Sequence, residues 1–140
     1  NPRGFRVKYY LLEGGAALSD ADFKLGSELL GSDRSTSFQT PLATLHAFNG
    51  WADLFLTTPA AGLRRAYAAA GKTAAGVRLE AIYHDFKADK GGARYGTEWD
   101  LQAVMPFAVR YAVGAKYASY RARTFSVDTD KFWIWVEAKF

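Results

Sequence analysis

The chain has 140 residues, which fits one domain and leaves little room for two. Hydrophobic residues make up 49% and charged residues 23%, which excludes a disordered chain, and the net charge of +4 comes from scattered basic residues. The lack of cysteine excludes disulfides, thiolate metal sites and a cysteine nucleophile, and two histidines, His46 and His84, are too few for a histidine metal site. Aromatic residues reach 16%, a high share that favours strands and membrane interfaces.

Apolar and polar residues alternate with a period of two through most of the chain, and this pattern predicts β-strands. In chain order, the predicted strands lie near residues 6–18, 22–32, 63–72, 76–87, 96–107, 110–122 and 130–140. The alanine-rich stretch 66–70 would suit a helix by propensity, but its length and its strand neighbours favour a strand. The sequence therefore predicts an all-β fold of about seven antiparallel strands in one domain, residues 1–140.

The connections between the predicted strands alternate in length. Short connections lie at 19–22, 73–76 and 108–109, and longer ones at 34–62, 88–96 and 122–130. Transmembrane β-barrels have this layout, with short periplasmic turns and longer extracellular loops. Strands of about ten residues also match the ~9–11 residues that a tilted strand needs to cross a bilayer. We therefore expect a transmembrane β-barrel.

The alternation does not by itself say which face is turned inward, because soluble and membrane barrels leave the same pattern. Two features favour a membrane barrel: aromatic residues end the apolar faces, as girdles would, and small residues and opposite charges share the polar faces. We expect the following residues to face lipid: Trp99, Leu101, Tyr111, Val113, Phe132, Ile134 and Phe140. A small soluble barrel with these aromatic residues in its core is the alternative.

The connection 34–62 is the longest and has a pattern of its own. Thr40-Pro41 is typical of a helix start, apolar residues recur at helical spacing, and Pro59 marks a stop, so the sequence predicts a short helix at about 42–56. This extracellular loop either folds into the barrel and narrows it or lies outside as a lid. The candidate constriction residues are Leu45, His46, Phe48, Trp51 and Phe55.

The polar faces of the strands supply the candidate pore-lining residues. They are Lys24, Arg65, Arg78, Glu80, Glu98, Asp100, Arg110 and Lys116. Basic and acidic residues nearly balance on these faces, so we expect most of them to pair across strands. No Ser, His and Asp arrangement and no phosphate-binding loop supports a catalytic site, so we expect no enzyme activity, no metal and no cofactor. Nucleic-acid binding is not expected either, because the aromatic residues lie mostly opposite the charges.

Several segments resemble a known family. These are 9–15 (YYLLEGG), 38–46 (FQTPLATLH), 48–53 (FNGWAD), 83–86 (YHDF) and 128–133 (DTDKFW), and together they resemble alginate-export-type outer-membrane porins. The resemblance implies a large antiparallel barrel that passes solutes across the bacterial outer membrane, with this chain as its carboxy-terminal part. Its partners would be outer-membrane lipid, polar solutes and the barrel-assembly machinery, which would meet the last strand ending at Phe140.

Three functions from different classes remain open at this stage. The first is an outer-membrane channel for polar or anionic solutes, the second a small soluble barrel that binds an apolar ligand, and the third a membrane barrel that does not conduct. An odd number of strands does not close a single-chain bacterial barrel. We therefore expect a fragment of a larger barrel, unless a strand is missed or chains complete one another's edges.

Overall fold

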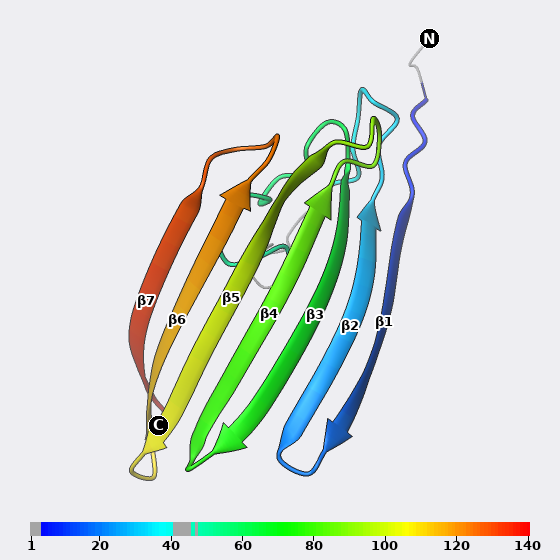
Figure 1. Ribbon diagram of the computed structural model, residues 1–140. Coiled ribbons are helices and arrows are strands. Elements are labelled where there is room, and N and C mark those ends of the chain that lie inside the picture. Colours follow the sequence, from blue (N-terminus) through cyan, green and yellow to red (C-terminus); the bar gives the residue numbers. More distant parts are fainter. Residues whose placement is uncertain (1–3, 41–45, 47) are drawn as a thin grey trace.

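A computed structural model of the chain describes residues 4–40, 46 and 48–140. The described residues form one antiparallel sheet whose strands follow chain order (Figure 1). Its strands are β1 (Tyr9–Leu18), β2 (Ala21–Leu30), β3 (Leu63–Ala74), β4 (Val77–Lys87), β5 (Arg94–Phe107), β6 (Tyr111–Ala122) and β7 (Thr129–Ala138). The predicted all-β fold of seven antiparallel strands is confirmed. The alanine-rich 66–70 stretch lies within β3, because alternate residues there pack on one face only.

The sheet is open within the described part of the chain. Pairing runs from β1 to β7, and these two strands are not paired with each other. Each of them therefore has one unpaired edge, and Figure 1 shows them at opposite sides of the sheet. These seven strands alone do not form a closed barrel, and the expectation that they belong to a larger one stays a prediction.

The connections gather by length at the two ends of the sheet. The turns at 19–20, 75–76 and 108–110 lie at one end, and the longer connections lie at the other (Figure 1). Ala75 and Gly76 both have positive φ, of 49° and 77°. This is the backbone of a type I′ turn, whose twist matches that of the strands it joins. The predicted alternation of short and long connections is confirmed.

The two faces of the sheet differ in chemistry. We call the face that packs against residues 48–58 the inner face, and the opposite one the outer face. Directly opposed residues form rows across the sheet, and residues in one row share a face. One outer row is Phe23, Ala70, Ala81, Leu101, Tyr117 and Phe132. One inner row is Glu13, Gly26, Tyr67, His84, Glu98 and Tyr120.

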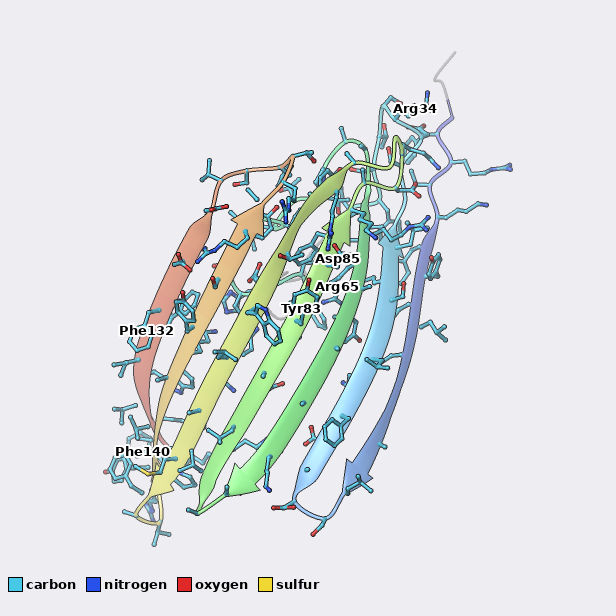
Figure 2. The ribbon with its side chains drawn as sticks, in the orientation of Figure 1. Arg34, Arg65, Tyr83, Asp85, Phe132 and Phe140 are labelled. Carbon is cyan, nitrogen blue, oxygen red and sulfur yellow. The ribbon has the colours of Figure 1, made fainter. Side chains whose placement is uncertain are left out.

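Burial is the reverse of what a water-soluble sheet requires. On the outer face, Leu25, Phe132 and Ile134 are 67%, 63% and 68% exposed. Tyr83 and Phe132 mark this face in Figure 2. On the inner face, by contrast, Glu98 and Asp100 are 1% and 0% exposed. The sheet thus presents a broad apolar surface outward and keeps charge inside.

The long connection between β2 and β3 folds back against the inner face, behind the sheet in Figure 1. The helix expected at about 42–56 is wrong for 48–56, which forms a series of turns and bends, and 41–45 and 47 lie outside the described residues. Ala52 and Phe55 are buried against the sheet, whereas Phe48 and Leu56 are each 54% exposed, so the apolar residues of this segment do not form one buried helical face. No described helix is long and apolar enough to cross a membrane.

Candidate functional site

Two buried carboxylates of β5 hold the loop against the inner face. The period of two places Glu98 and Asp100 on the same face. The amide of Ala52 donates to Glu98 Oε1 at 2.6 Å, and the amide of Trp51 donates to Asp100 Oδ2 at 3.1 Å. Buried carboxylates need such donors, since their desolvation is costly when no partner is present. The two acidic residues therefore act as anchors for the loop backbone.

The loop can approach these carboxylates because Gly50 has no side chain. Its φ of +86° is in the left-handed region that favours glycine. A Cβ atom at this position would also collide with the Glu98 carboxylate. Gly50 therefore serves both the turn and the close contact between loop and strand.

An aromatic cluster provides the apolar part of the loop's contact. Phe55 is 1% exposed and its ring centroid lies 4.4 Å from that of Phe86 and 5.0 Å from that of Phe125. Tyr95 joins this cluster because a β-bulge at the β4–β5 pair, between Phe86 and Lys87, leaves it as an extra residue. Its hydroxyl donates to the carbonyl of Gly62 at 2.9 Å, so the bulge also fixes the end of the loop.

A second set of polar contacts ties the loop to β6 and β7. His46 Nδ1 lies 2.5 Å from Asp53 Oδ1, and His46 Nε2 lies 2.5 Å from Lys116 Nζ. Lys131 Nζ donates to the other Asp53 oxygen at 3.0 Å. Lys116 Nζ also lies 5.2 Å and 5.0 Å from the ring centroids of Trp51 and Trp133. We call His46, Asp53, Lys116 and Lys131 the loop latch.

The electrostatics of the latch favour an ionised Asp53. Burial by itself would raise the pKa of Asp53, but the hydrogen bonds from His46 and Lys131 outweigh it and hold the pKa below the ordinary value of 3.8. A carboxyl whose pKa is lowered on folding stabilises the fold above its unfolded pKa, and this contribution is lost as the pH falls through the folded value. The latch should therefore weaken in acid.

We expect Asp53→Asn to weaken the attachment of the loop by about 1 kcal/mol and to remove its contribution to the acid dependence. Hydrogen exchange of the peptide 48–58, corrected for the intrinsic effect of pH, measures loop opening. The wild-type loop should begin to open more as the pH falls below about 4, and the difference from Asp53→Asn should vanish only once the pH is below the lowered pKa of Asp53. Asp130→Asn is the control, because Asp130 pairs with Arg121 away from the loop. Identical pH profiles for wild type and Asp53→Asn would contradict the role of Asp53.

The inner face of β1 to β4 has a different arrangement, in which each cation meets a carboxylate. Arg65 Nη2 lies 2.9 Å from Glu28 Oε2, and both residues are less than a tenth exposed. Lys24 pairs with Glu13 of the neighbouring strand at 3.1 Å, and Arg78 of β4 pairs at 2.5 Å with Asp22 of β2, two strands away.

The predicted pore-lining residues largely share one face. The structure places Lys24, Arg65, Arg78, Glu80, Glu98, Asp100 and Lys116 on the inner face. Arg110 instead lies in the exposed turn between β5 and β6, where its carbonyl accepts from the amide of Lys139. The sequence placed Arg110 at the start of a strand, but β5 ends at Phe107 and β6 begins only at Tyr111, so Arg110 belongs to the turn between them.

The predicted constriction residues divide into three groups. His46, Trp51 and Phe55 contact side chains of the inner face. Phe48 is 54% exposed, although it lines a cavity beside the loop. Leu45 lies outside the described residues.

Sequence reasoning missed the partners of both histidines. His46 meets Asp53 and Lys116, and His84 Nε2 lies 3.2 Å from Asp100 Oδ2. The register of the β4–β5 hairpin places His84 opposite Glu98, so a correct hairpin alignment would have found the second contact. The contacts of His46 depend on the path of the connection between β2 and β3, which no periodic pattern in the sequence predicts.

No three acidic or histidine side chains among the described residues converge as a metal ion would require. Comparison with protein-family models found no match, and no curated protein or solved structure matches the chain. The site is therefore interpreted from its own geometry.

Proposed function

We propose that this chain forms part of the wall of an outer-membrane β-barrel channel that passes polar solutes. The outer face would contact lipid, the inner face would line the lumen, and residues 48–58 would narrow it. This is the function expected from the resemblance to alginate-export-type porins. The proposal asks for no chemical step from any residue, so it includes no enzyme activity.

The observation that carries the proposal is the reversal of the two faces. An outer row of directly opposed residues is apolar across six strands, while glutamate, aspartate and arginine are buried on the inner face. In water, so large an exposed apolar surface would need a partner to cover it. The lipid of a bilayer would cover the outer face of every strand. A soluble barrel that binds an apolar ligand would need the opposite arrangement, with an apolar inner face.

The open edges of the sheet fit the same proposal only if further strands pair with them. An unpaired strand edge exposes N–H and C=O groups, which lipid cannot satisfy. We therefore include additional strands beside β1 and β7 in the proposed barrel. The barrel-assembly machinery of the outer membrane would be a partner of the proposed barrel.

We expect the full-length protein to conduct ions when reconstituted in a planar bilayer. Deleting residues 40–58 should raise the single-channel conductance, because this segment includes the described part of the loop that covers the inner face. The deletion variant must keep the β-sheet circular dichroism of the parent protein, which serves as the folding control. An unchanged conductance would place the loop outside the pore. Full-length protein that stays monodisperse without detergent would refute the membrane assignment itself.

A further inference from the structure

The inner face is divided into a half that the loop covers and a half that it leaves hollow. The loop packs mainly on β5 to β7, through the carboxylates of Glu98 and Asp100 and through the latch residues Lys116 and Lys131. Beside the loop, the inner face of β1 to β4 borders a cavity of about 560 Å³. Thr40 and Phe48 of the connection line its border. A solute that passes the loop therefore finds its space along β1 to β4.

The charges around this cavity do not favour anions. The lining cations are Lys24, Arg65 and Arg78, and the lining carboxylates are Glu13, Asp22, Glu28 and Glu80. Each cation is paired with a carboxylate of another strand, and the Arg78 side chain reaches from β4 past β3 to Asp22 of β2. Among the described residues Glu80 forms no ion pair, so with His84 neutral the cavity has one excess negative charge. A polyanion would meet no unpaired cation on this wall.

The lining also contains groups suited to a small cationic solute. Tyr9 and Phe48 present rings to the cavity, whereas one face of the Tyr67 ring is already occupied by Arg65, whose Cζ lies 4.4 Å from the ring centroid. Aromatic faces attract cations through their quadrupole. His84 is 3% exposed, and its Nδ1 atom has no hydrogen-bond partner among the described residues. Buried polar atoms of this kind are normally satisfied by water or by a ligand.

We propose that the solute route runs along the hollow half, past Glu80, and that it takes small cationic solutes in preference to anions. This inference rests on the proposed function, because it concerns the selectivity of the same lumen. It differs from the expected channel for polar or anionic solutes, because an anion route would need unpaired cations such as Arg65 or Arg78 on this wall. The structure pairs both of them, and the field that remains is that of Glu80.

The reversal potential of the full-length protein in a KCl gradient tests the inference. We expect a potassium-to-chloride permeability ratio above one, and Glu80→Gln should lower it by up to about sevenfold, because a unit charge about 7 Å away in water changes the permeability of each ion about threefold, in opposite directions. Glu137→Gln is the matched control, because Glu137 lies on β7 outside the cavity lining and makes the same change of charge. It should change the ratio less.

The possible results separate the inference from the function on which it rests. A permeability ratio of one or below in a conducting protein would overturn the cation route and leave the channel intact. Equal effects of Glu80→Gln and Glu137→Gln would overturn the assignment of the route to the hollow half. Folded protein that does not conduct in any variant would overturn both proposals.

Discussion

Phe55→Ala should detach the loop from the inner face. Phe55 is 1% exposed and packs between Phe86 of β4 and Phe125 of the β6–β7 connection. Truncating a fully buried phenylalanine costs about 3–5 kcal/mol, because the transfer free energy is lost and a cavity remains. If this cost falls on loop attachment, the open fraction of the loop increases by at least about a hundredfold.

Limited proteolysis with chymotrypsin measures this opening, since the segment 48–58 contains several aromatic and leucine residues. Leu56→Ala is the matched control: Leu56 is the next residue in sequence but is itself 54% exposed, so we expect little change in cleavage rate. The sheet itself should keep its circular dichroism in both variants. Equal cleavage rates for Phe55→Ala and Leu56→Ala would show that the aromatic cluster does not hold the loop.

A lysine at the centre of the outer face should be costly in lipid. Leu101 lies near the middle of β5, is 44% exposed on the outer face and is opposed by Ala81 and Tyr117. In a membrane barrel a lysine at the lipid-facing midplane costs roughly 2–4 kcal/mol. We therefore expect Leu101→Lys to lower the stability of the full-length protein by that amount in denaturant titrations with lipid vesicles.

The next residue of the same strand provides the comparison. Gln102 lies on the inner face, opposite Glu80 of β4. Gln102→Lys adds the same charge on the inner face, beside the carboxylate of Glu80. It should therefore change the free energy of unfolding little. Were the outer face turned to water, Leu101→Lys would instead be tolerated and would increase solubility. Equal tolerance at both sites would therefore contradict the assignment of faces.

The residues that hold the loop on the inner face are different from the residues that border the cavity beside it. The side chains of Glu98 and Asp100 accept hydrogen bonds from the loop backbone, and the ring of Phe55 packs on Phe86. The cavity along β1 to β4 is bordered instead by ion pairs between strands. A substitution among the loop contacts should therefore change loop opening without changing ion preference. A substitution in the cavity lining should change ion preference without changing loop opening.

The sequence by itself determined the strands and the chemistry of each face. In a strand, alternate residues point to opposite faces, so the sequence decides what each face carries. Residues 98 and 100 are acidic and residues 99 and 101 are apolar, so β5 has one acidic and one apolar face wherever it lies. Turn residues such as Ala75-Gly76 similarly determined the lengths of the hairpins. The exception was 48–56, where apolar residues at helical spacing form turns: Ala52 and Phe55 are buried against the sheet, but Phe48 is 54% exposed.

Only the tertiary structure decided which groups meet across the inner face. The bulge that turns Tyr95 toward Phe55, and the loop path that brings His46 between Asp53 and Lys116, depend on contacts between residues far apart in sequence. The pairing of Arg65 with Glu28 depends on the register of β2 against β3, across a long connection whose length does not determine it. Strand periodicity is a local property of the chain, whereas register and loop docking are decided by the packing energy of the whole sheet.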